Sequence, residues 1–139
     1  MSARYFLDTN ILVYVFSADA PKKRKRANNL VREALTARRG VISYQVVQEF
    51  LNVALRKFER PFINSEARHY YLKVLKPLCV LQSSSHLFLR ALSIQEETNF
   101  QWYDSLIVAS ALESGCAVLY SEDLQHERVI EGMAIENPF

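Results

Sequence analysis

Short apolar runs alternate along the chain with longer stretches in which apolar residues recur every three or four positions. The runs predict short buried strands, and they lie at residues 4–8, 41–42, 78–81, 116–120 and 133–135. The longer stretches predict amphipathic helices, at residues 11–16, 27–35, 46–55, 65–76, 85–97 and 103–114. Strands that alternate with helices are typical of a parallel sheet covered on both faces. The predicted fold is therefore α/β, with three layers in which helices flank a short central parallel sheet.

Residues at the ends of these helices predict where each begins and ends. Side chains that can cap a helix N-terminus precede several of them, and the expected caps are Thr9 or Asn10, Asp19, Ser43 and Ser121. Gly40 and Gly115 are expected to end the helices that precede them. Pro77 is expected to end the helix that begins near residue 65, because proline interrupts a helical hydrogen-bond ladder.

Four carboxylates, Asp8, Glu49, Asp104 and Asp123, are spread over almost the whole chain. Three of them come just after an apolar run or in the first turn of the helix that follows it. Ligands of open parallel sheets bind at the carboxyl ends of the strands, so acids from distant segments can converge there. Converging carboxylates raise one another's pKa unless a cation lies between them. The sequence therefore predicts a divalent metal site, and Mg²⁺ or Mn²⁺ suits all-oxygen ligands.

Two of these acids also have simpler explanations. Asp8 can cap the helix that follows it, although Thr9 and Asn10 can do the same and would leave Asp8 available for another role. Asp104 lies in a first helical turn, where the helix dipole favours an acid. It also falls at the centre of an apolar stripe, where a carboxylate is costly unless it is paired. The stripe favours a functional role for Asp104.

The other two acids are weaker candidates. Asp123 follows a strand, but its neighbour Glu122 competes for the same role. Glu49 lies on a polar helix face, which is usually exposed to solvent. Beside Asp104, the dipeptide Trp102–Tyr103 can stack a nucleic-acid base, although packing over the sheet is the simpler interpretation.

Charge is distributed unevenly along the chain. The net charge is +2, yet residues 1–60 carry twelve basic and five acidic residues, which gives +7, and residues 61–139 carry five and ten, which gives −5. The densest basic run consists of Lys22, Lys23, Arg24, Lys25 and Arg26. Cations at a helix start oppose its dipole, so the run indicates either a surface that contacts phosphates or a solvated helix start.

Cysteine usage and the N-terminus bear on the compartment. Cys79 and Cys116 lie in apolar runs without metal-type spacing, which is typical of buried thiols in a reducing compartment. No signal peptide is visible, and the early apolar run of residues 11–16 is too short to span a bilayer. We expect a soluble cytoplasmic protein that does not associate with membranes.

Several motifs resemble those of PIN-domain ribonucleases and, within that family, the toxin half of VapBC toxin–antitoxin pairs. The resemblance rests on Leu7–Asn10, Glu49, Tyr103–Ile107, Ser121–Leu124 and the ending at residues 129–139. It covers essentially all 139 residues, which implies a single PIN-like nuclease domain over residues 1–139. One departure is Glu127, which stands where such toxins usually have glycine.

The resemblance implies an acidic quartet that cleaves RNA with Mg²⁺ or Mn²⁺. The quartet falls on Asp8, Glu49, Asp104 and Asp123. The expected metal ligands are Asp8, Asp104 and Asp123, while Glu49 would hold a second ion or orient the attacking water. The supporting hydroxyl and amide groups fall on Thr9, Asn10 and Ser121. The resemblance also implies a homodimer and a small antitoxin protein whose tail blocks the cleft. The basic run at residues 22–26 is denser than this family leads us to expect, and its charge predicts that it binds RNA.

Other phosphate chemistries fit the motifs less well. A haloacid-dehalogenase-type phosphatase needs an acid two residues after the first Asp, where this chain has Asn10. A response-regulator receiver needs paired acids and a late lysine, but Asp8 has no acidic neighbour and no lysine follows Lys76. A PIN-like module that binds nucleic acid or regulates without cleavage stays open, as does a nuclease that acts on DNA.

Overall fold

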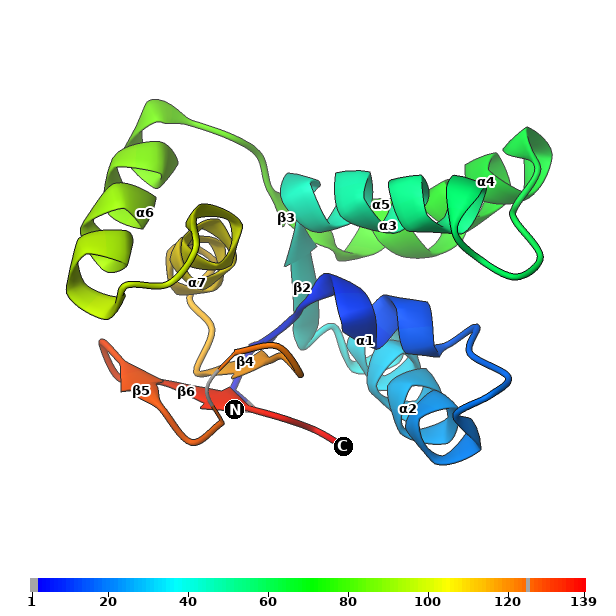
Figure 1. The fold of residues 1–139 in the computed structure, drawn as a ribbon, viewed down its shortest axis with the longest axis horizontal. Helices are drawn as coiled ribbons and strands as arrows, with labels where there is room; N and C mark the ends of the chain where they lie inside the picture. Colours follow the sequence, from blue (N-terminus) through cyan, green and yellow to red (C-terminus); the bar gives the residue numbers. More distant parts are fainter. Residues whose placement is uncertain (1–2, 125) are drawn as a thin grey trace.

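The computed structural model describes residues 3–124 and 126–139 and has a six-stranded sheet at its centre (Figure 1). The strands lie in the order β3 (Cys79–Leu81), β2 (Gly40–Ser43), β1 (Tyr5–Leu7), β4 (Val118–Tyr120), β6 (Met133–Glu136) and β5 (Val129–Ile130). All neighbouring pairs are parallel except β5 and β6, which are antiparallel. The predicted parallel sheet is confirmed, and β5 is an addition that the hydrophobic pattern did not predict.

Helices cover the sheet on both sides, as the alternation of elements predicted. Those of the first half are α1 (Thr9–Tyr14), α2 (Pro21–Ala37), α3 (Tyr44–Arg56) and α4 (Asn64–Tyr70). A π-helical turn η1 (Tyr71–Leu75) and α5 (Lys76–Leu78) follow, and the later helices are α6 (Ser85–Thr98) and α7 (Trp102–Glu113). Figure 1 shows α6 and α7 together on one side of the sheet and α1 and α2 on the other. The three-layer α/β/α architecture is confirmed.

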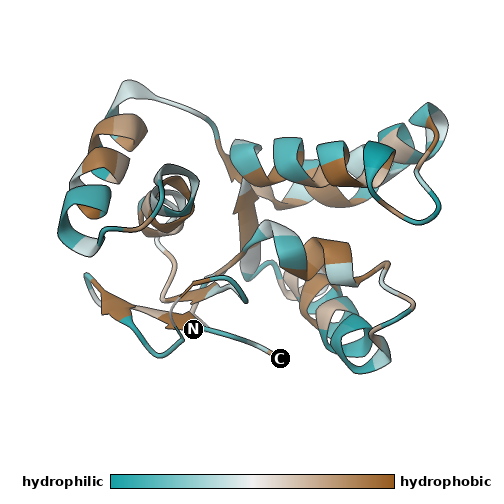
Figure 2. Ribbon diagram, in the orientation of Figure 1, coloured by the Kyte–Doolittle hydropathy of each residue, from teal (hydrophilic) through white to brown (hydrophobic). Residues whose placement is uncertain are grey.

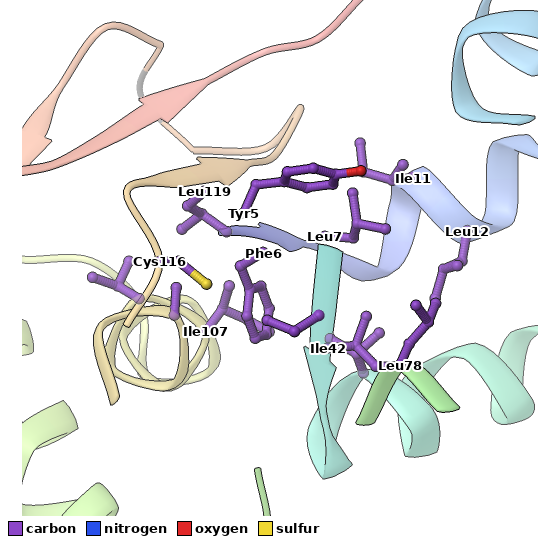
Figure 3. Packing of buried hydrophobic residues seen from close by; sticks show 14 of the residues in the cluster. Tyr5, Phe6, Leu7, Ile11, Leu12, Ile42, Leu78, Ile107, Cys116 and Leu119 are labelled. Carbon is purple, nitrogen blue, oxygen red and sulfur yellow. The ribbon is translucent and has the colours of Figure 1, made fainter. Parts of the chain in front are cut away.

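The core lies between these layers, and β1 contributes to both of its halves. Phe6 points toward Ile107 of α7, whereas Tyr5 and Leu7 point toward α1 (Figure 3). All three side chains of β1 are buried, and the strands are among the most apolar segments of the ribbon in Figure 2. Burial of each large apolar side chain contributes about 1.5–3 kcal/mol. The central strand that precedes Asp8 is therefore fixed from both faces.

The end of α2 differs from the prediction. Arg38, with a φ of 56°, takes the left-handed conformation that closes the helix, and Gly40 lies inside β2. A Cβ atom at Gly40 would lie 2.4 Å from Cβ of Ala34 and 2.7 Å from the ring of Tyr5. Gly40 is needed for the close approach of α2 to the sheet.

Three further expectations about backbone and caps are corrected. The helix from residue 64 continues past Pro77, because the π-helical turn η1 precedes it and proline is tolerated in the first turn of α5. Ala20, not Asp19, occupies the N-cap position of α2 and makes no side-chain cap. Ser43 precedes α3 as predicted but makes no capping hydrogen bond.

Glu127 adopts a φ of 67°, in the left-handed region that glycine enters without cost. This is the position at which the resembling toxins usually have glycine, so the departure noted in the sequence places a strained residue in the turn before β5. Its N–H donates to the carbonyl of Ile135 at 2.8 Å, which holds the turn against β6.

Within the described part of the chain, none of the helices combines the length and apolar character that crossing a bilayer requires.

Candidate active site

The candidate site lies where the chain changes direction across the sheet. From β1 the chain proceeds outward to β2 and β3, and then returns to the other side of β1 as β4. Ligands of open α/β sheets bind at such a switch point, outside the carboxyl ends of the strands. Asp8 follows β1 directly and Ser121 follows β4. The two meet there, because the Ser121 hydroxyl donates to Oδ2 of Asp8 at 2.8 Å.

Asp8 is 6% exposed and is the N-cap of α1, since its Oδ1 accepts the Thr9 N–H at 2.7 Å. The expectation that Thr9 or Asn10 would cap this helix and release Asp8 is therefore wrong: Asp8 ends the strand in the extended conformation that an N-cap requires. Burial raises the pKa of Asp8 to about 7, although the hydrogen bonds from Ser121 and Thr9 oppose the shift. The charges of Glu49 and Asp123 raise this pKa further.

Glu49 is held at the site by hydrogen bonds rather than lying on an open face. The Thr9 hydroxyl donates to its Oε1 at 2.6 Å, and Gln45 Nε2 lies 3.4 Å from its Oε2. Gln45 also donates to the carbonyl of Tyr103 at 3.2 Å, which links α3 to the start of α7. Glu49 is only half-exposed and Gln45 is 5% exposed. The interpretation of this face as plain solvent surface is therefore wrong for Gln45 and Glu49, although Gln48, Asn52 and Arg56 on the same face are exposed.

Gln45 is a site residue that the sequence reasoning missed. Its only signal was its position one helical turn before Glu49, which places both on one face of α3. A glutamine in such a position is normally solvated, so the signal was too weak to use alone.

Asp123 reaches the site through the segment Ser121–Leu124, called here the Asp123 loop. Asn10 Nδ2 donates to Oδ2 of Asp123 at 3.0 Å. Ser121 Oγ accepts the N–H groups of Asp123 and Leu124 at 3.2 and 3.4 Å, so it stabilises a turn and not the short helix that was expected. The competing acid, Glu122, is engaged elsewhere by Tyr14 and Lys23.

Asp104 lies in the first turn of α7, half-buried, as its place in the apolar stripe suggested. Partial burial raises its pKa, and the charges of Asp123 and Glu49 add to the shift. The charges of the same two acids also raise the pKa of Asp8, so the four carboxylates form one repulsive electrostatic group. Four segments that are far apart in the sequence thus bring negative charge to one edge of the sheet.

The chemistry of this group fits a hard divalent cation. Among residues 3–124 and 126–139, no three His, Cys, Asp or Glu side chains are close enough together to hold a metal ion directly. Mg²⁺, however, is usually bound through one or two carboxylates and keeps several waters. Asn10 Oδ1 and Gln45 Oε1 are buried acceptors with no protein partner in the described structure, and both can accept hydrogen bonds from such waters. The donor set therefore fits Mg²⁺ or Mn²⁺.

In both the basic run and the aromatic dipeptide, some side chains are exposed while others contact the rest of the fold. Lys22, Arg24, Lys25 and Arg26 are exposed at the start of α2, while Lys23 is half-exposed and ion-paired to Glu122. Trp102 packs near Phe88 of α6 with ring centroids 6.4 Å apart. Tyr103 is 66% exposed beside Asp104, so the expectation that it packs over the sheet is wrong.

Comparisons with known proteins agree with this architecture. The model of the PIN-domain family matches residues 5–131. A toxin–antitoxin complex from Klebsiella pneumoniae is similar, with 20% identity over 99% of this chain and 98% of that chain and a TM-score of 0.72. VapBC2 from Rickettsia felis, bound to a fragment of its promoter DNA, has 21% identity over 96% and 97% of the two chains and a TM-score of 0.65.

A third similar structure is VapC20 from Mycobacterium tuberculosis, described as a toxin that cleaves the sarcin–ricin loop. It has 17% identity over 86% of this chain and 89% of that chain, with a TM-score of 0.62. At these identities the three structures establish a shared fold. No curated protein sequence matches the chain significantly.

Proposed function

The chain belongs to the PIN-domain family, and on this basis we propose that it is a Mg²⁺- or Mn²⁺-dependent endoribonuclease, the toxin of a VapBC-type toxin–antitoxin pair. The observation that carries the proposal is the electrostatic coupling of four acids from four segments at the switch point of the sheet. A module that only bound nucleic acid would gain nothing from four repelling carboxylates beside a phosphate backbone. The RNA-cleaving relative VapC20 supports RNA as the substrate.

Asp8, Glu49, Asp104 and Asp123 are the proposed catalytic acids. Asp8, Asp104 and Asp123 would hold the ion, at least one of them through water, and Glu49 would hold a second ion or orient the attacking water. The bound ion supplies charge relief on the phosphate and makes water nucleophilic at neutral pH.

Thr9, Asn10 and Ser121 hold the carboxylates in the positions that this chemistry requires. Ser121 fixes one oxygen of Asp8, while the Thr9 N–H fixes the other. The Thr9 hydroxyl orients Glu49, and the Asn10 amide orients Asp123. Groups that orient ligands in this way commonly affect metal affinity and activity by 10–100-fold when they are removed.

RNA would reach the site across the start of α2 and the beginning of α7. The exposed cations of the run at residues 22–26 provide charge for the phosphate backbone. Tyr103, exposed next to Asp104, provides an aromatic face on which a base can stack.

We propose a single domain over residues 1–139 that is located in the cytoplasm. Its proposed partners are a second copy of the chain and a cognate antitoxin. The toxin–antitoxin complexes among the similar structures support an antitoxin. A pocket of about 920 Å³ beside α1 offers a mixed surface for a partner protein, because its lining combines aromatic side chains such as Phe16 and Phe58 with charged ones such as Lys57 and Glu66.

A cleavage assay with purified protein and total RNA, with and without Mg²⁺ or Mn²⁺, tests the function. Asp8→Ala, Asp104→Ala and Asp123→Ala should each abolish metal-dependent cleavage, because each removes a proposed oxygen ligand. Glu49→Ala should cause a large loss of rate. Glu96→Ala, which removes an exposed acid on α6, is the matched control and should cleave like the wild type.

Binding of RNA should survive in the three Asp variants or become tighter, because a negative charge near the phosphates is removed. Folded Asp8→Ala or Asp104→Ala protein that cuts at the wild-type rate would overturn the assignment. A wild type that binds RNA but never cuts it with either ion would favour a binding module. Cleavage of single-stranded DNA alone would favour a deoxyribonuclease.

A further inference from the structure

Glu122, the residue before Asp123, is held by two side chains from the first half of the chain. Lys23 Nζ lies 2.6 Å from Glu122 Oε2, and the Tyr14 hydroxyl donates to Glu122 Oε1 at 2.6 Å. Lys23 also lies 3.4 Å from the Tyr14 hydroxyl, so the three groups are linked pairwise. Both oxygens of Glu122 therefore have a fixed partner, one from α1 and one from α2.

The same face of α1 holds two consecutive residues of the Asp123 loop. Asn10 and Tyr14 are one helical turn apart. Asn10 binds the Asp123 carboxylate at 3.0 Å, and Tyr14 binds the Glu122 carboxylate at 2.6 Å. Displacement of Glu122 would therefore pull on the residue that carries the proposed metal ligand.

Aromatic rings partly shield the ion pair. The ring of Phe139 packs edge-on against Tyr14 with centroids 5.0 Å apart, and Lys23 Nζ lies 4.9 and 5.6 Å from the centroids of these two rings. An exposed ion pair usually contributes little. Here the ammonium group has two aromatic neighbours and the carboxylate has a second donor, so the geometry is held by several contacts at once.

We propose that Tyr14, Lys23 and Glu122 form a latch that holds the Asp123 loop against α1 and α2 and thereby positions Asp123. Lys23 is then a positioning residue, although its place in the basic run suggested an RNA contact. The role assigned to Asp123 rests on the proposed function, whereas the latch itself rests only on the contacts of these three residues.

Amide hydrogen exchange tests the latch without metal or RNA. The informative amides are those of Asp123 and Leu124, which donate to Ser121 Oγ. Glu122→Gln and Lys23→Met should each speed their exchange by roughly tenfold, because the loop opens more often. The double variant should exchange no faster than either single variant, since one interaction is lost in all three. Glu33→Gln, which breaks the 2.9 Å ion pair with Arg39 near the far end of α2, should leave these amides unchanged.

Calorimetric titration with Mn²⁺ tests what the latch does for the site. Glu122→Gln and Lys23→Met should bind Mn²⁺ about tenfold more weakly, and Glu33→Gln should bind it like the wild type.

In RNA binding, Lys23→Met should keep the wild-type salt dependence, whereas Lys22→Met should flatten it.

Unchanged exchange in Glu122→Gln would overturn the latch. Faster exchange with wild-type Mn²⁺ affinity would overturn its role in positioning Asp123. A wild type that binds no Mn²⁺ would instead count against the proposed function, and hydrogen exchange would still decide whether the latch exists.

Discussion

At the scale of single residues, the surroundings of the Asp8 carboxyl group have opposing effects on its charged form. It caps α1, accepts the Ser121 hydroxyl and is almost fully buried. Two hydrogen bonds favour its charged form, yet burial outweighs them and raises its pKa to about 7. A carboxylate placed in this way costs stability whenever it is ionised without a cation nearby.

Asp8 should therefore make the metal-free protein sensitive to pH. Its pKa is near 3.8 when unperturbed and about 7 in the fold, so the folded state binds an extra proton between these values. The stability that this proton provides is fully present below about pH 4 and is lost as the pH rises through 7. The loss amounts to a few kcal/mol, because each pKa unit corresponds to about 1.4 kcal/mol.

The measurement is urea unfolding of chelator-treated wild type and Asp8→Asn between pH 5 and pH 8. The Asn variant cannot ionise, so the free-energy difference between the two proteins should move in favour of the variant as the pH rises. Parallel profiles would contradict the assignment of a raised pKa to Asp8.

At the scale of elements, the sequence was sufficient wherever an element is defined by its own residues. The strand at residues 5–7 and the helix that begins at Trp102 have clear patterns, and these elements present Asp8 and Asp104. The strand β5 has only two residues and exists through its pairing with β6, which no local pattern encodes. The continuation past Pro77 likewise depends on a π-helical turn that propensities do not predict.

The same distinction applies to the candidate site. Acids that follow strands could be found from the sequence, because the ends of parallel strands meet at one edge of the sheet. The roles of Gln45, Lys23 and Glu122 could not be found, since they depend on side chains that meet only in the fold. Lys23 and Glu122 are 99 residues apart. In the sequence, Lys23 belongs to the basic run at residues 22–26, and Glu122 is one of two acids that follow a strand.

The start of α2 should bind RNA through the cations that face solvent. Replacing Lys22, Arg24 and Lys25 by Ala should weaken binding to all RNAs alike and reduce the salt dependence, because each phosphate contact releases counterions. Three lost contacts to single-stranded RNA correspond to a slope smaller by about 2. Replacing Arg68, Lys73 and Lys76, which are exposed on the segment from α4 to α5, removes the same charge and should leave the slope unchanged. Equal slopes in the two triple variants would show that the run is a solvated helix start.

At the scale of the whole molecule, the cation and the fold should stabilise each other. The four acids repel one another in the folded chain, and unfolding separates them. Mg²⁺ or Mn²⁺ should therefore stabilise the protein by binding the native state. At 100 times the Kd the free energy of unfolding should rise by about 2.7 kcal/mol, which corresponds to an increase of several degrees in the melting temperature. Asp104→Asn should raise the melting temperature of the metal-free protein, because it removes one of the repelling charges.

A thermal scan in chelator and in increasing Mn²⁺ measures both effects. Glu96→Gln, outside the site on α6, is the control and should behave like the wild type in each condition. No response of the wild type to either ion would count heavily against a shared site.

The position of β1 between β2 and β4 also has a consequence during translation. Asp8 leaves the ribosome before the rest of the proposed site, because its partner Ser121 lies 113 residues later in the chain. A nascent chain that has formed β1, β2 and β3 still has one open edge on β1, and neither Asp104 nor Asp123 is yet available to complete the site. Synthesis at roughly 5–20 residues per second makes this interval several seconds long. A domain proposed to cut RNA would therefore lack its complete set of acids until β4 and the Asp123 loop have emerged from the ribosome.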